Sequence, residues 1–161
     1  MHQFRITKYD PAVRNKSGHY TREEWTAFSD VGRTVGGVVL TLAEYERVEA
    51  AYIDAALGFL REAGICTLSI RGLENSFDSP SAPTEGAELE LSALAEAMRG
   101  VLREEFWCRF EGRSAFVHFG WDYYMYVGVA SLCESAQRAA SEQGLFVEPF
   151  ASPYRDGPEP N

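Results

Sequence analysis

The sequence lacks the features that mark membrane proteins, disulfide-stabilised secreted domains and metal centres. The chain has 161 residues and no apolar run approaching the ~20 residues that a transmembrane helix needs. Its three cysteines are 42 and 25 residues apart and form no C-x-x-C pair. We therefore expect free, buried thiols and neither a disulfide framework nor a metal site. Residues 1–5 show no apolar segment typical of a secretory signal, and these absences favour a reducing, cytoplasmic location.

The sequence also lacks the motifs and the charge that bind phosphate groups. Residues 32–37 contain three glycines, but no apolar strand precedes them and no Lys-Ser or Lys-Thr pair follows. The net charge is −9, with +2 on residues 1–40 and −11 on residues 41–161. Because such a surface repels phosphates and anionic lipids, we expect no nucleic-acid, membrane or cofactor partner. A basic protein is the complementary partner, and acidity that serves only solubility is the alternative.

What the sequence does contain is a regular succession of strand and helix patterns. Residues 3–9 alternate, which predicts a strand with Phe4 and Ile6 on one face. Thr41 with Glu44 forms a capping box that predicts a helix ending at Gly64. The same reasoning predicts strands at 37–40, 65–71, 106–111, 115–119, 123–129 and 145–150, a helix at 90–105, and a helix that starts at Ser131, with Glu134 in a second capping box, and ends at Gly144.

The main elements follow the order β-α-β-α-β-β-β-α-β. Helices on one face of a mainly antiparallel sheet would bury the apolar stripes, so we predict a two-layer α+β fold with three helices. No linker or internal repeat divides the chain, and we therefore expect one domain over residues 1–151. Residues 152–161 contain three prolines, which predicts a disordered C-terminal tail.

The sequence offers only a weak basis for catalysis. His118 is the one acid–base candidate, close in sequence to Asp122. Ser114 shares its predicted strand face but lies about 13 Å along the strand, too far for a hydrogen bond. The alternative is a histidine packed between aromatic rings of a sheet. Adjacent acids such as Glu104 and Glu105 point apart on a helix and predict a solvated face. We expect no catalytic residues.

Two segments stand out as candidates for binding a protein. Residues 74–105 carry eight acidic and two basic side chains and begin with a loop that contains Phe77. Four aromatic residues in 121–126 cannot all face one core, and alternation places Trp121 and Tyr123 on the same side. Acidic groups around an exposed aromatic suit a basic partner, whereas a loop that is merely solvated is the alternative. The candidate partner-binding residues are Glu74, Phe77, Asp78, Glu85, Glu88, Trp121, Asp122 and Tyr123.

Several short aromatic and acidic blocks are spread over most of residues 5–130: KYDP (8–11), EWT (24–26), SDVG (29–32), LEN (73–75), REEFWC (103–108) and FGWDYYMY (119–126). These blocks resemble those of a family of small acidic bacterial immunity proteins, which are encoded beside contact-dependent or polymorphic toxins. The resemblance implies a non-catalytic cytoplasmic protein that binds and neutralises a basic toxin domain, and it assigns no binding residues. The alternatives are a small hydrolase or transferase that uses His118 and Asp122, and a regulatory or scaffold domain that binds another protein.

Overall fold

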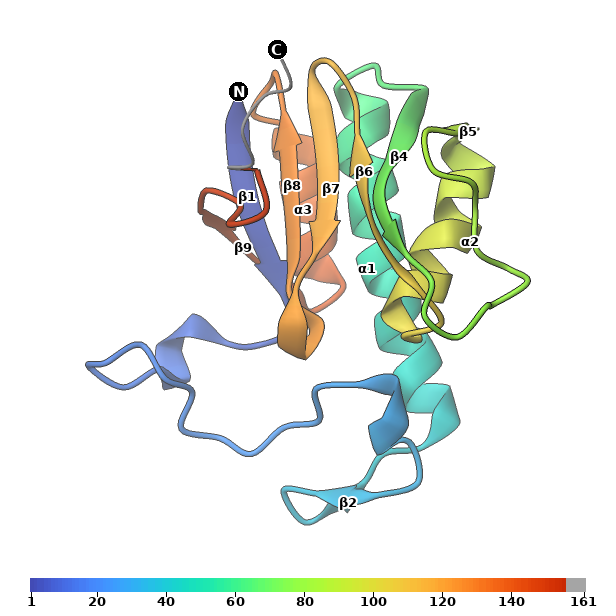
Figure 1. Cartoon of the computed structure of the whole chain (residues 1–161). Helices are drawn as coiled ribbons and strands as arrows, with labels where there is room; N and C mark the ends of the chain where they lie inside the picture. The colour runs from blue at the N-terminus through green and yellow to red at the C-terminus, as the bar shows by residue number, and fades with distance from the viewer. Residues whose placement is uncertain (156–161) are drawn as a thin grey trace.

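The computed structural model describes residues 1–155 and shows a seven-stranded sheet with helices on one face (Figure 1). The strand order is β5-β4-β6-β7-β8-β1-β9, and each neighbouring pair is antiparallel. The predicted α+β class and mainly antiparallel sheet are therefore confirmed. The strands of this sheet are β1 (His2–Thr7), β4 (Thr67–Glu74), β5 (Glu88–Glu90), β6 (Trp107–Glu111), β7 (Ala115–Phe119), β8 (Met125–Val129) and β9 (Phe146–Pro149).

Helices and short turns complete the part of the chain that the structure describes. The strands β5 and β2 are additions to the predicted elements, whereas β3 lies within the strand predicted at 37–40 and pairs with β2 in a small separate hairpin. No helix within residues 1–155 is long and apolar enough to cross a membrane. The remaining elements are the helices α1 (Leu42–Glu62), α2 (Leu91–Leu102) and α3 (Glu134–Glu142), the strands β2 (Thr34–Val35) and β3 (Val38–Val39), and the 3₁₀ turns η1 (Pro11–Val13), η2 (Phe28–Asp30) and η3 (Trp121–Tyr123).

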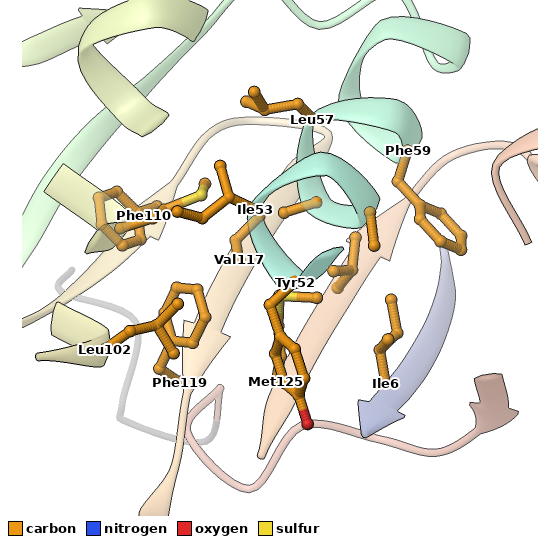
Figure 2. Packing of buried hydrophobic residues seen from close by; sticks show 14 of the residues in the cluster. Ile6, Tyr52, Ile53, Leu57, Phe59, Leu102, Phe110, Val117, Phe119 and Met125 are labelled. Atoms are coloured by element: carbon orange, nitrogen blue, oxygen red, sulfur yellow. The ribbon is translucent and has the colours of Figure 1, made fainter. Parts of the chain in front are cut away.

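The core lies between the sheet and the three helices, with α1 at its centre, because apolar side chains repeat with the periods of the helix and strand backbones. Phe4 and Ile6 point inward from β1, as predicted, and Val117 does so from β7. The apolar stripe of α1 includes Tyr52 and Phe59, both fully buried. Figure 2 shows these side chains of α1 facing Ile6 and Val117 of the sheet. The face of the sheet that points toward the helices is thus buried in the core.

Both predicted ends of α1 are confirmed, but only half of the predicted capping box forms, because the Glu44 carboxylate accepts hydrogen bonds from Arg47 instead. The Thr41 hydroxyl accepts the backbone N–H of Glu44 at 3.1 Å, which satisfies one of the free amides at the helix start. After the helix, Gly64 takes the left-handed conformation with φ 72°, which ordinary side chains disfavour. The chain then turns back directly into β4.

The predicted capping box of the third helix is wrong. Neither Ser131 nor Glu134 caps α3 with its side chain. The carboxylate of Glu62, at the end of α1, accepts the N–H of Ala136 at 2.7 Å and that of Ser135 at 3.3 Å. A negative charge suits the positive end of a helix dipole. The cap is supplied from more than seventy residues away in the chain, so a local sequence pattern does not reveal it.

The segment between β1 and α1 runs around one end of the sheet (Figure 1) and is anchored on the helices by aromatic rings. The ring of Phe28 packs edge-on against Tyr45 of α1 at 4.8 Å between centroids. Arg103, directly after α2, lies over the Phe28 ring at 5.1 Å. The same guanidinium donates two hydrogen bonds, of 2.8 and 2.9 Å, to the buried carboxylate of Glu49. These contacts fix the carboxyl end of α2 relative to α1.

The C-terminal segment is ordered further than the sequence predicts. Ser152 is only 4% exposed, and its amide donates to the Gln3 side chain at 2.9 Å. Its hydroxyl lies 2.8 Å from the His118 ring, and Arg109 donates to the Tyr154 carbonyl at 3.1 Å. The predicted disorder is therefore corrected for residues 152–155, which β1, β6 and β7 hold on the sheet face opposite the helices. Residues 156–161 of the predicted tail lie outside the described residues.

Candidate functional site

A groove with a volume of about 610 Å³ lies where β4, β6 and β7 meet the carboxyl end of α2. Ligand sites in proteins commonly have volumes of this order. Its walls come from the loop after β4, the residues that follow α2, the η3 turn and the C-terminal segment. The lining residues are Thr26, Ala27, Glu74, Ser76, Phe77, Val101, Leu102, Glu104, Phe106, Trp107, Phe119, Gly120, Trp121, Asp122, Tyr123 and Tyr154.

Two aromatic side chains of the groove are almost completely exposed. Phe77, in the loop after β4, is 81% exposed, and Trp121, in the η3 turn, is 85% exposed. Burying a side chain of this size typically stabilises a protein by about 2 kcal/mol, and neither ring makes that contribution here. Exposed aromatic side chains beside a cavity are typical of protein-binding surfaces.

The η3 turn holds Trp121 outward through an unusual backbone. Asp122 and Tyr123 both have left-handed φ angles, 59° and 65°, which cost about 1 kcal/mol or more for residues with a Cβ. Tyr9 fixes the turn by donating to the Asp122 carbonyl at 2.6 Å, while the Tyr123 hydroxyl donates to Tyr45 at 3.0 Å inside the core. The expectation that Trp121 and Tyr123 share a side is therefore wrong, because this segment is a turn and strand alternation does not apply.

The apolar wall of the groove depends on a glycine in α2. Phe106 packs so closely on Gly100 that a Cβ at this position would overlap the ring. Beside it, the indole N–H of Trp107 donates to the Phe119 carbonyl at 2.9 Å, which fixes the orientation of the indole. Tyr154 lies against Trp107 with 5.8 Å between ring centroids. The C-terminal segment therefore contributes to the wall, although the sequence predicts disorder there.

The groove is acidic and contains no basic side chain. Its lining includes Glu74, Glu104 and Asp122, and no Lys, Arg or His among the described residues. Within residues 1–155 these three carboxylates take part in no ion pair or side-chain hydrogen bond. Two less exposed acids elsewhere are neutralised: Glu49 pairs with Arg103, and Glu148 pairs with two arginines. The negative charge of the groove is thus available to a ligand.

Five of the eight residues expected to bind a partner line this groove: Glu74, Phe77, Trp121, Asp122 and Tyr123. The structure thus brings the acidic loop and the aromatic turn together, at the same end of the sheet. They are separated by more than forty residues in the sequence, and the pairing of β4 with β6 and of β6 with β7 places them side by side.

The other three expected residues lie outside the groove lining. Asp78 follows Phe77 in the loop, with φ 50°, and does not line the groove. The Glu85 carboxylate accepts two backbone N–H groups of β4, at 3.2 and 2.7 Å, where the strand has a bulge. Glu88 accepts a hydrogen bond from Thr67 at the sheet edge. These contacts stabilise the loop and the edge strand.

Sequence reasoning did not single out the other lining residues of the groove, among them Glu104, Phe106, Trp107 and Tyr154. Glu104 was expected on a solvated helix face, but α2 ends at Leu102. Glu104 instead takes a left-handed φ of 59° and lines the groove. The block of acids and aromatics at 103–108 was the available signal. For Tyr154 the sequence held no such signal.

His118 is fully buried and hydrogen-bonded at both ring nitrogens. Its Nε2 lies 3.0 Å from a carboxylate oxygen of Glu111, and its Nδ1 lies 2.8 Å from the Ser152 hydroxyl. Because an ionised carboxylate only accepts, Nε2 carries the proton, and Nδ1 accepts from Ser152. Burial lowers the pKa of His118 to about 4, against the opposing influence of Glu111. The ring also stacks on Phe116 at 4.3 Å, as expected for a histidine packed among sheet aromatics.

Serine, histidine and glutamate in contact are the residue types of a nucleophilic triad, but here the serine and the histidine are closed to solvent. His118 is 0% exposed and Ser152 is 4% exposed. None of the three lines the groove, and Asp122, the partner that the sequence suggested for His118, lines the groove instead. The cluster therefore fastens the C-terminal segment to β7.

The cysteines and acids of the described part form no metal site. Within residues 1–155 no group of three or more His, Cys, Asp or Glu side chains is arranged to hold a metal ion. All three cysteines are free, and Cys108 and Cys133 are buried as expected. Burial raises the pKa of the Cys108 thiol to about 12, which keeps it protonated. Cys66 is exposed, contrary to expectation, because β4 begins only at Thr67.

Comparisons of the chain with protein-family models, with curated proteins and with solved structures found no match. The chemistry of the groove is therefore the main guide to function. It combines exposed rings with carboxylates that no basic side chain of residues 1–155 neutralises. Such a surface suits a ligand that carries both positive charge and apolar surface.

Proposed function

We propose that the protein is a non-catalytic, cytoplasmic immunity protein that binds and neutralises a cognate bacterial toxin through this groove. The observation that carries the proposal is the combination of two exposed rings, Phe77 and Trp121, with three unpaired carboxylates around one cavity. Toxins that cleave nucleic acids are basic where they hold phosphate, so an acidic surface is complementary to them. The resemblance of the sequence blocks to bacterial immunity proteins supports the same function.

The groove and the overall charge have different roles in this proposal. The net charge of −9 accelerates the encounter with a basic domain over long range. Phe77 and Trp121 supply the short-range contacts, because binding buries apolar surface that the free protein exposes. Truncating such an anchor typically costs about 2 kcal/mol of binding free energy, or about 30-fold in Kd.

Two features favour binding over hydrolysis or group transfer by His118 and Asp122. The ring of His118 is buried, and both its nitrogens are occupied by Glu111 and Ser152. A general base must reach the proton that it abstracts, and solvent does not reach this ring. Asp122 belongs to the groove, where its charge faces a partner.

The proposal is tested by co-expressing the protein with the toxin encoded by a gene beside its own. Cells should survive with the wild-type protein and die with the double variant Phe77→Ala and Trp121→Ala. Val38→Ala is the matched control, because it also truncates an exposed apolar side chain (70% exposed) but on the β2–β3 hairpin. Thermal unfolding of each variant shows whether it is folded. Survival with the double variant rejects this interface, and death with the wild type rejects the immunity function.

A further inference from the structure

The proposed interface has chemistry that identifies one kind of partner side chain. Seven aromatic rings line the groove: Phe77, Phe106, Trp107, Phe119, Trp121, Tyr123 and Tyr154. The faces of aromatic rings attract cations, and carboxylates add direct charge complementarity. The acids of the groove are Glu74, Glu104 and Asp122, and no Lys, Arg or His of residues 1–155 is among the lining residues. A groove of this composition suits a cation carried on an apolar stem.

The protein already contains a cation that lies beside both aromatic rings and a carboxylate, and this cation is an arginine. Arg103 lies over Phe28 and Tyr45, at 5.1 and 6.0 Å, while Glu49 accepts its two hydrogen bonds. The fold thus already places a guanidinium between aromatic faces and a carboxylate. A planar guanidinium can stack on a ring and also donate in pairs to a carboxylate.

A second arginine of the protein, Arg5, also lies beside aromatic rings and pairs with a carboxylate. Arg5 lies 4.2 Å from the Phe150 ring centroid and 5.7 Å from that of Tyr124, and it pairs with Glu148 at 3.2 Å. The groove contains the rings and the acids of such a site but supplies no arginine of its own.

Lysine behaves differently in aromatic surroundings of this chain. The Lys8 ammonium lies 4.2 Å from the ring centroids of both Tyr9 and Trp25. Burial lowers the pKa of Lys8 to about 8, despite nearby carboxylates that raise it. Burial among aromatic rings thus lowers the pKa of a lysine, whereas an arginine remains charged.

We propose that the groove receives an arginine side chain of the partner protein, with its guanidinium directed at Glu74, Glu104 and Asp122 and its apolar stem against the rings. A volume of about 610 Å³ also admits the residues that flank this arginine. The inference rests on the proposed function only in taking the partner to be a protein. A toxin that binds nucleic acid would present such an arginine from its own phosphate-binding surface, so occupation of the groove would remove a phosphate-binding group.

The test uses short peptides, so it does not require the toxin. The probes are acetylated and amidated Gly-Trp-Arg-Gly, the same peptide with citrulline in place of arginine, and the same peptide with lysine. Citrulline keeps the shape of arginine and lacks its charge. Binding is followed by NMR through the indole N–H signals of Trp107 and Trp121. The arginine peptide should shift both signals and bind about tenfold more tightly than the citrulline peptide, as expected for an aromatic and carboxylate site.

Variants locate the binding and guard against a non-specific charge effect. Glu104→Gln and Asp122→Asn keep the shape of the groove and should each weaken the arginine peptide several-fold. Asp54→Asn removes an exposed carboxylate of α1, away from the groove lining, and should leave binding unchanged. Equal binding of arginine and citrulline, equal binding of arginine and lysine, or no shift of either indole would overturn the inference.

The outcome also separates this inference from the proposed function. If the arginine peptide binds as expected but the groove variants still protect cells from the toxin, the arginine site stands and the immunity interface lies elsewhere. If the groove variants abolish protection but arginine and citrulline bind equally, the interface stands and the arginine assignment is wrong.

Discussion

Acidification provides a sharp stability prediction, because the folded protein keeps His118 neutral. The pKa of His118 is lowered by burial from 6.5 to about 4. As the pH falls below 6.5, the unfolded chain therefore takes up a proton on this residue before the folded chain does. The contribution of His118 to stability is complete above this range and is lost as the pH falls from 6.5 towards 4.

The size of the effect follows from the shift. One pKa unit corresponds to about 1.4 kcal/mol of unfolding free energy. Protonation of His118 over the whole pH range therefore lowers the free energy of unfolding by about 3 kcal/mol, of which about 2 kcal/mol is lost between about pH 7 and about pH 5. The charged groups that act on the ring are Glu111, which raises the pKa, and Arg109 and Arg155, which lower it. The uncharged neighbours are Ser152, Phe116 and Tyr154.

Urea unfolding of the wild type and of His118→Gln at the two pH values measures this contribution. Glutamine retains donor and acceptor groups for Ser152 and Glu111 but does not titrate. The wild type should lose about 2 kcal/mol more than the variant on acidification, and variants that fold should still bind the toxin at neutral pH. Equal losses would refute the reasoning. Independently, the ring signals of His118 in the folded wild type should show no protonation down to about pH 5, whatever the fate of the variant.

Two further predictions concern packing and capping. Gly100→Ala should destabilise the protein by about 1–3 kcal/mol in urea unfolding, although alanine is the better helix former, because the new methyl group overlaps Phe106; an increase in stability would show that the ring moves freely. Glu62→Ala should destabilise by about 1 kcal/mol, because it frees the amides of Ser135 and Ala136. Faster hydrogen exchange should then appear first in α3, and exchange unchanged there would contradict the assigned cap.

The regular elements could be predicted because their signals are local. Alternation placed Phe4 and Ile6 inward, and the Thr41 cap with Gly64 bounded α1. The same signals failed where a distant residue decides the outcome. Ser152 is ordered by His118, thirty-four residues earlier in the chain, so a composition rich in proline misleads there.

The candidate site was predictable only in part. Phe77 stands out in the sequence because it has little local reason for burial, and Trp121 because the four aromatic residues of 121–126 cannot all face one core. Their common position in one groove depends on strand pairing that the sequence order alone does not determine. Glu85 shows the converse error, since an acidic loop residue satisfies backbone amides of its own strand. Counting charges along the chain does not distinguish a carboxylate that is available to a partner from one that accepts hydrogen bonds from the protein's own backbone.

The central claim is that the groove, and not the net charge alone, binds the toxin. The most direct test compares two triple variants that lose the same charge, by measuring their affinity for the purified, catalytically inactivated toxin domain encoded beside the gene. One variant combines Glu74→Gln, Glu104→Gln and Asp122→Asn within the groove. The control combines three exposed acids outside the groove lining, as Asp54→Asn, Glu134→Gln and Glu142→Gln. We predict that the groove variant loses at least about tenfold in affinity, mainly through faster dissociation, while the control changes only the association rate. Equal affinities of the two variants would contradict the claim.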